Sequence, residues 1–354
     1  MKLEDLDRNF AVQTEINEPD LVWLNVRSVP FAVDGLLYDE AAHRFTRMPK
    51  DAAQAVSASV AELCTDTAGG RVRFRTDSSA IAIRVVTHNR PAMNKMARTG
   101  QSGFDLYWDK DGELLFKQAL IPPADLTDGY SSLAKTDGVL RDYLIHFPLY
   151  DVVNDLFIGL KKDCVLEAPT PYADALPVVY YGSSITQGAC ASHPGNAYEA
   201  QIARWINRDF LNLGFAGSAK GEAAMSEYIA SLPMSAFVCD FDYNCKSADE
   251  LRAAHEPFVR TVRAAQPELP IILVSAPRAI RGEASYLDRR QVVIDTYEKL
   301  IAEGDRNVYF VDGKTLFEGV NWDLCTVDMT HPNDLGFFRM AQKIGEPLIK
   351  IFSK

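Results

Sequence analysis

In the second half of the chain, short apolar segments alternate with longer helix-compatible stretches, and few folds accommodate this pattern. Ser247 and Glu250 form a capping box at the start of one such stretch. A strand that reads as almost continuously apolar is typical of a parallel sheet covered by helices on both faces. We therefore expect residues 177–354 to form a three-layer α/β/α domain of flavodoxin-like type. Its sheet would have five parallel strands, at 178–181, 210–213, 236–239, 271–274 and 308–311.

The first half of the chain has the pattern of an all-β structure. Charged and apolar residues alternate along 71–75, as in a half-buried strand. The segments 104–108 and 113–116 flank the turn 109–112, which predicts a hairpin. Helical periodicity is confined to the stretch around 52–63. We expect residues 1–170 to form a jelly-roll-like β sandwich that serves as an accessory domain. Along its first predicted strand we interpret Arg71, Arg73 and Arg75 as a solvated face rather than an anion-binding stripe.

A proline-rich connector separates the two patterns. Residues 169–177 contain Pro169, Pro171 and Pro177. Proline favours extended backbone and interrupts strand ladders, so this segment is the best candidate for a domain boundary.

Charge and cysteine content exclude several classes of protein. The 354 residues include 37 Lys and Arg against 48 Asp and Glu, a net charge of −11, which disfavours nucleic-acid and membrane-surface partners. No apolar run reaches the ~18 residues of a membrane-spanning helix. Acidic residues in segment 1–7 stand where a secretory signal would be basic and then apolar, so we expect a cytoplasmic protein, although a chain with its leader removed would look the same. The six cysteines form no Cys-x-x-Cys pair, which favours free thiols over a disulfide framework or a zinc site.

Polar residues that could carry chemistry follow the predicted strands. Ligands of parallel α/β sheets bind beyond the carboxyl ends of the strands. Ser184 follows the first strand, where we expect it to begin a helix, and Gly217 follows the second. Asn244 follows the third strand, and Asp328 precedes His331 by three residues after the fifth. Each signal alone is weak, because glycine, serine and asparagine are common turn residues.

Taken together and in this order, these residues resemble the four sequence blocks of the SGNH (GDSL-type) hydrolases, over about 177–354. The resemblance implies that Ser184 is the nucleophile, His331 the base and Asp328 its orienting partner. It also implies an oxyanion hole formed by the Ser184 N–H, the Gly217 N–H and the Asn244 amide. Segment 103–107 resembles the GxDLY signature of a domain that precedes a subset of these hydrolases. Two departures occur: Ser183 replaces an acidic residue, and 242–245 replaces Gly-x-Asn-Asp.

The resemblance implies a serine esterase without cofactor or metal. We expect it to hydrolyse a small acyl ester, acetyl in the first instance, on a small molecule or oligosaccharide, with Trp322 as a candidate wall of the substrate site. The loop around 105–108 is the part of the first domain that we expect to reach the cleft. A lipid or platelet-activating-factor-type acylhydrolase and a non-catalytic carbohydrate-binding protein are the alternatives. The sequence carries no signal for the oligomeric state.

Overall fold

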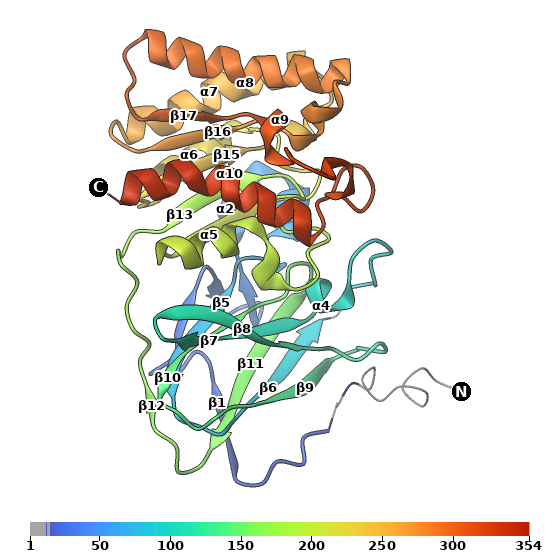
Figure 1. The fold of residues 1–354 in the computed structure, drawn as a ribbon, viewed down its shortest axis with the longest axis vertical. Coiled ribbons are helices and arrows are strands. Elements are labelled where there is room, and N and C mark those ends of the chain that lie inside the picture. The colour runs from blue at the N-terminus through green and yellow to red at the C-terminus, as the bar shows by residue number, and fades with distance from the viewer. Residues whose placement is uncertain (1–11, 13–14, 89, 354) are drawn as a thin grey trace.

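The computed structural model describes residues 12, 15–88 and 90–353, and the acidic segment 1–7 lies outside the described residues. In Figure 1 the strands of the first half occupy the lower part of the molecule and the α/β layers of the second half the upper part. The predicted combination of a β sandwich with an α/β/α unit is confirmed.

The upper part contains a five-stranded sheet in which all neighbouring strands are parallel. Its order is β14-β13-β15-β16-β17, and Gly182 pairs with both Gly214 and Asp240, so three strand ends lie level. The strands are β13 (Val178–Gly182), β14 (Phe210–Gly214), β15 (Ala236–Asp240), β16 (Ile271–Val274) and β17 (Val308–Val311). The helices are α5 (Tyr198–Ile206), α6 (Ala223–Ser231), α7 (Ala248–Ala265), α8 (Ala284–Ala302), α9 (Gly313–Leu316) and α10 (Asp334–Phe352). Short 3-10 turns are η2 (Pro194–Asn196), η3 (Asp242–Asn244), η4 (Pro277–Arg281) and η5 (Trp322–Leu324).

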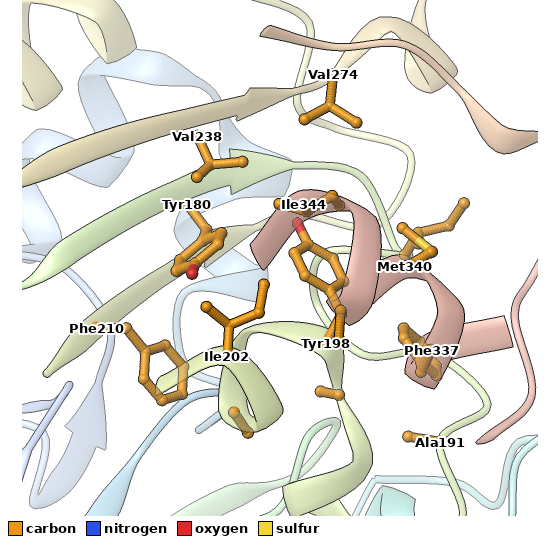
Figure 2. Close-up of a cluster of buried hydrophobic side chains, with 14 of the residues drawn as sticks. Tyr180, Ala191, Tyr198, Ile202, Phe210, Val238, Val274, Phe337, Met340 and Ile344 are labelled. Atoms are coloured by element: carbon orange, nitrogen blue, oxygen red, sulfur yellow. The ribbon is translucent and has the colours of Figure 1, made fainter. Parts of the chain in front are cut away.

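Alternate residues of each strand enter two separate apolar cores. Tyr180 packs with helices α5 and α10 on one face, through a cluster that includes Tyr198, Ile202 and Phe337 (Figure 2). Tyr181, its neighbour, points to the opposite face, where helices α6, α7 and α8 lie. This two-residue alternation, with apolar residues at both phases, explains why the strands read as continuous apolar runs.

The lower part is a sandwich of two antiparallel sheets. One has the order β1-β11-β6-β9 and the other β12-β5-β10-β7-β8, with β2 paired to β5. The predicted hairpin joins β7 and β8 through Asp111 and Gly112, whose φ angles of 60° and 87° suit a tight turn. The strands are β1 (Leu21–Asn25), β2 (Ala32–Asp34), β5 (Arg71–Thr76), β6 (Ala80–His88), β7 (Phe104–Lys110), β8 (Glu113–Leu120), β9 (Gly129–Lys135), β10 (Arg141–His146), β11 (Val152–Lys161) and β12 (Leu166–Glu167). A separate pair is formed by β3 (Leu37–Asp39) and β4 (Arg44–Thr46).

Part of the first half packs into the core of the second. Helices α2 (Lys50–Val56) and α3 (Ala58–Leu63) replace the single helical stretch that the sequence suggests, because Ser57 is extended and caps α3 by accepting from the Val60 N–H. Met48 and Val60 are fully buried in the same cluster as Tyr181 and the inner faces of α6 and α7. We define residues 48–64 as the α2–α3 segment. It packs beside α6 in the core on one face of the parallel sheet.

The arginines of β5 lie at the contact between the two halves. Arg71 is 1% exposed, forms an ion pair with Asp209 and donates to the Phe210 carbonyl at 3.0 Å. Arg73 pairs with Asp34 at 2.7 Å, and its guanidinium lies over the Tyr172 ring. Our interpretation of a solvated strand face is therefore wrong for Arg71 and Arg73, because the connector and the start of β14 cover them.

All six cysteines are free, as predicted. None of the described helices has both the length and the apolar content that a membrane span requires.

Candidate active site

A tight turn after β13 presents Ser184. A Cβ at Gly182 would lie only 2.4 Å from the Asp240 carbonyl oxygen, so only glycine fits where the chain leaves the sheet. Residues 184–190 form successive turns, in which the Ala189 N–H donates to the Ser184 carbonyl at 2.9 Å. The prediction that Ser184 begins a helix is wrong. Gly188 and Cys190 have φ angles of 92° and 73°, which end helical geometry before α5 begins at residue 198.

Ser184 and Asp328 both lie within hydrogen-bonding reach of the His331 ring. Ser184 Oγ is 3.0 Å from His331 Nε2, although the two residues are 147 positions apart. On the other side of the ring, His331 Nδ1 is 3.0 Å from Asp328 Oδ2 and 3.2 Å from Oδ1. Such an arrangement can move a proton from a hydroxyl to an imidazole that a carboxylate orients.

The loop that carries His331 is held closed around Asp328. The backbone N–H groups of Thr330 and His331 donate to Asp328 Oδ1 at 3.1 and 2.8 Å. Lys95 Nζ lies 2.8 Å from Asp328 Oδ2. Partial burial acts to raise the pKa of Asp328, but the His331 amide, the Lys95 ammonium and the His331 ring together hold it below its usual value. The carboxylate therefore stays ionised over the working pH range of an esterase.

Gly217 and Asn244 follow the two strands that flank β13, so both lie at the sheet edge where Ser184 is found. Gly217 has a φ of 65°, and no atom lies within 4 Å of the position a Cβ would take. The Asn244 amide nitrogen donates to the Phe215 carbonyl at 3.1 Å. An amide nitrogen carries two hydrogens, so the second stays free for a ligand oxygen.

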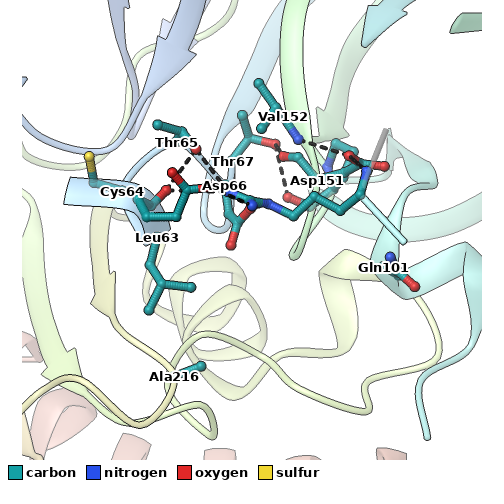
Figure 3. Close-up of polar contacts among 12 residues, drawn as sticks. Leu63, Cys64, Thr65, Asp66, Thr67, Gln101, Asp151, Val152 and Ala216 are labelled. Carbon is teal, nitrogen blue, oxygen red and sulfur yellow. Dashed lines mark hydrogen bonds and ion pairs between the residues drawn. The ribbon is translucent and has the colours of Figure 1, made fainter. Parts of the chain in front are cut away.

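A polar chain from the β sandwich supports the turn on which Gly217 lies. Gln187 donates to Asp66 Oδ2 at 3.0 Å, and its other amide atom accepts from the Ala216 N–H at 3.0 Å. Asp66 is fully buried and also pairs with Arg90. Figure 3 shows Asp66 within this network, with Ala216 on the neighbouring loop. The first half of the chain thus fixes backbone next to Gly217, a role that the sequence did not suggest.

Buried carboxyl groups lie beneath the Ser184 turn. The hydroxyls of Thr186 and Tyr198 donate to Asp240 Oδ2 at 3.2 and 3.3 Å. Burial raises the pKa of Asp240 well above its usual value, and burial raises the pKa of Glu199 to about 8. Glu199 is therefore mostly protonated at neutral pH. In the sequence, these two groups stand out only as single acidic residues beside apolar ones: Asp240 follows the apolar run 236–239, and Glu199 lies at the start of α5.

Two further expectations concern the walls of the site. Trp322 is half-buried against the core that contains Phe337, with the Arg281 guanidinium 5.3 Å from its ring centre, so its role toward substrate stays a prediction. The segment 105–108 is part of strand β7 and contacts His193 and Gly195 rather than the triad. Lys95 is instead the residue of the first half that reaches Asp328, and nothing in its polar sequence context marked it.

Comparisons with known families identify both halves. Residues 175–350 match the family described as "GDSL-like Lipase/Acylhydrolase family". Residues 21–166 match the GxDLY family, described as "N-terminus of Esterase_SGNH_hydro-type". The chain is a GDSL-like hydrolase. This family membership, which the sequence predicted, makes the protein a carboxylic ester hydrolase.

Solved structures share the whole two-part architecture of this GDSL-like hydrolase. A structure from Bacteroides ovatus, assigned as a GDSL-like lipase, is 28% identical with a TM-score of 0.84, and the match covers 94% of this chain and 98% of that one. The salicylyl-acyltransferase SsfX3 of a tetracycline biosynthetic pathway is 20% identical with a TM-score of 0.74, covering 95% and 98%. A family two carbohydrate esterase from Clostridium thermocellum is 14% identical with a TM-score of 0.62, covering 91% and 99%. No curated protein matches the chain. Within the described residues of this hydrolase, no three His, Cys, Asp or Glu side chains gather as a metal site.

Proposed function

We propose that this GDSL-like hydrolase cleaves esters through an acyl-enzyme, with Ser184 as nucleophile, His331 as general base and Asp328 as its orienting partner. The observation that carries the proposal is the 3.0 Å separation of Ser184 Oγ and His331 Nε2, with Nδ1 of the same ring on Asp328. His331 takes the Ser184 proton while Oγ attacks the ester carbonyl. The alcohol leaves with that proton, and water, again deprotonated by His331, releases the acid.

The negative oxygen of the tetrahedral intermediate would be held by three donors. These are the backbone N–H groups of Ser184 and Gly217 and the second hydrogen of the Asn244 amide. The support for Gly217 is its place after β14 and the open space at its Cβ position, where no atom lies within 4 Å. The support for Asn244 is the hydrogen bond from its side-chain amide to the carbonyl of Phe215, two residues before Gly217. This bond holds the amide beside the Gly217 turn, where it can donate its second hydrogen.

The substrate that we propose is a small acyl ester, acetyl in the first instance, on a carbohydrate. The Clostridium thermocellum relative was solved with cellohexaose, and a further relative of the same architecture is an acetyl xylan esterase from Butyrivibrio proteoclasticus. Both matches include the β sandwich as well as the hydrolase part, because each covers more than 90% of this chain. Trp322 is the aromatic side chain that we propose for stacking on a sugar ring.

A longer acyl chain is the second candidate, and the surface beside Asp328 favours it. Val327 and Met329 flank Asp328 and are 49% and 55% exposed, and Leu324 is 58% exposed. Exposed apolar side chains beside an ester site can bind the hydrocarbon chain of a lipid ester.

Labelling with a fluorophosphonate tests the mechanism and rejects the non-catalytic alternative. The wild type should bind one equivalent and Ser184→Ala none, with both proteins melting at the same temperature. Hydrolysis by Ser184→Ala should fall by ~10⁴-fold or more. A variant that retained wild-type esterase activity would contradict the assignment of Ser184.

Acetate release then tests the substrate. We expect release from acetylated xylan, glucomannan or chitooligosaccharide, and faster hydrolysis of p-nitrophenyl acetate than of p-nitrophenyl octanoate. A strong preference for the octanoate, without acetate release from any glycan, would favour the lipid candidate.

A further inference from the structure

A cation from the β sandwich contacts the acid of the proposed triad. Lys95 lies between β6 and the short helix α4 (Arg98–Gln101). Figure 1 shows α4 at the junction of the two halves. Its Nζ is 2.8 Å from Asp328 Oδ2, the same oxygen that lies 3.0 Å from His331 Nδ1. The ammonium and the imidazole therefore share one carboxylate oxygen.

The backbone around Lys95 is fixed by contacts on both sides. The Gln101 side chain accepts from the Met93 N–H at 2.8 Å and donates to the Pro91 carbonyl at 2.9 Å. Met96, next to Lys95, is 8% exposed and packs in the core of the hydrolase part. Gly100 lies so close to the loop after Ser184 that a Cβ there would be 2.1 Å from the Ala191 carbonyl oxygen. Although the Lys95 side chain is largely exposed, its Cα is held in place.

The electrostatic surroundings of the His331 ring are simple. Asp328 lies at its Nδ1 and in turn binds Lys95, and Ser184 lies at Nε2. Arg278, from η4, reaches Thr330 Oγ1 at 3.4 Å but is paired with Glu283. Burial raises the pKa of the nearby Cys190 thiol to about 11, and the Tyr243 phenol, whose pKa burial raises to about 12, is also neutral. Among the residues that the structure describes, Lys95 is therefore the lysine or arginine that forms an ion pair with Asp328.

We propose that Lys95 is a positioning residue of the esterase site: it fixes the Asp328 carboxylate and opposes protonation of His331. A cation on the shared oxygen competes with the imidazolium for the same negative charge. The inference rests on the proposed function, because it matters for catalysis only if His331 is the base.

The test compares pH profiles of kcat/KM for p-nitrophenyl acetate. In Lys95→Met, the midpoint of the acidic limb should rise by about half a pH unit, because one charge at this distance in a solvated site changes a protonation equilibrium by that order. The plateau should fall by about threefold to tenfold. Lys95→Arg, which keeps the charge, should restore the wild-type midpoint. Lys350→Met is the matched control, since Lys350 is an exposed lysine paired with Glu346 at 2.6 Å far along α10.

The dependence of the acidic midpoint on ionic strength gives a second measurement. If Lys95 had only a structural role, salt would shift this midpoint equally in the wild type and in Lys95→Met. In the wild type and in Lys350→Met, which both keep Lys95, 1 M salt should move the acidic midpoint toward that of Lys95→Met. The midpoint of Lys95→Met itself should move less. Equal midpoints in wild type and Lys95→Met would overturn the inference while leaving the triad intact. Full activity of Ser184→Ala would instead overturn the proposed function itself.

Discussion

Asp105 Oδ2 lies 2.5 Å from Nδ1 of His193, so the aspartate of the GxDLY segment contacts the loop that follows the Ser184 turn. The same oxygen accepts from the Gly195 N–H at 2.6 Å, and Oδ1 lies 2.7 Å from His146 Nδ1. Asp105 is fully buried. Burial acts to raise the pKa of Asp105, but His146 and His193 hold it well below its usual value. An ionised carboxylate thus joins the two halves.

Asp105→Asn should destabilise the protein, because it leaves buried donors facing an amide in place of a carboxylate. Breaking a buried pair from one side typically costs ~3–5 kcal/mol, so we expect the Tm to fall by about 5 °C or more. Since the pKa of Asp105 is lowered on folding, its contribution is present above the unfolded value of 3.8 and is lost as the pH falls below it. Calorimetry of Asp105→Asn against Asp111→Asn, in the exposed hairpin turn, measures the effect. Equal melting temperatures would show that the contact is dispensable.

Asn244→Ala should impair turnover while the fold stays intact. Removing one oxyanion donor typically costs ~2.7–4 kcal/mol of transition-state stabilisation, so kcat should fall by ~10²–10³-fold. The KM should change little, because the bond forms mainly in the transition state. The measurement is steady-state kinetics, with Asn154→Ala as the control. The Asn154 amide donates to the His43 carbonyl in the first half, so this variant also loses an asparagine hydrogen bond but should keep its kcat. An unchanged kcat would remove Asn244 from the proposed oxyanion hole.

Gly217→Ala should reduce activity through backbone strain alone. Gly217 and Gly304 both have positive φ, of 65° and 97°, and at neither position does an atom lie within 4 Å of where an alanine methyl group would be. Alanine at either position should lower stability by ~1–2 kcal/mol. Only Gly217→Ala should also lower kcat/KM, by about tenfold or more, because rotation of its N–H weakens the oxyanion contact. Equal kinetics in the two variants would contradict a role for Gly217.

Glu199→Gln should reduce the loss of stability that occurs as the pH rises toward 8. Glu199 is buried, and burial raises its pKa from 4.5 to about 8. A carboxyl group with a raised pKa favours folding below pH 4.5, and this contribution is lost as the pH rises through about 8. Glutamine keeps an oxygen to accept from the Asn212 amide but cannot ionise.

The Tm of the wild type should therefore drop by about 3 °C more than that of Glu199→Gln between pH 6 and pH 9. Glu227→Gln, at an exposed position of α6, serves as control. Parallel melting curves for wild type and Glu199→Gln across this range would show that Glu199 does not titrate there.

Local patterns predicted the α/β part well. Strands β16 and β17 have the bounds that their apolar runs indicate, and Ser247 caps α7 by accepting from the Glu250 N–H. These features depend on residues close in sequence. The order of the candidate site residues along the strands also predicted that Ser184 and His331 meet, since the carboxyl ends of parallel strands share one edge.

What the sequence could not reveal depends on contacts between the halves. Arg71 has the alternation of a solvated strand, yet Asp209, 138 residues later, buries it. Lys95 lies in a polar loop like many others, and the packing of its neighbour Met96 in the hydrolase core helps to bring it to Asp328. Gly188 and Cys190 adopt left-handed backbone, which the composition of the Ser184 turn did not specify. Long-range packing decided each of these outcomes.

The α2–α3 segment has a practical consequence for anyone dividing the protein. A clone that begins at the connector would lack Met48 and Val60, and the apolar side chains of α6 that face α2 would meet water. Such a fragment should aggregate on expression even though it contains every residue of the proposed triad. The minimal hydrolytic unit is therefore not the contiguous second half but a chain that still carries its early helices.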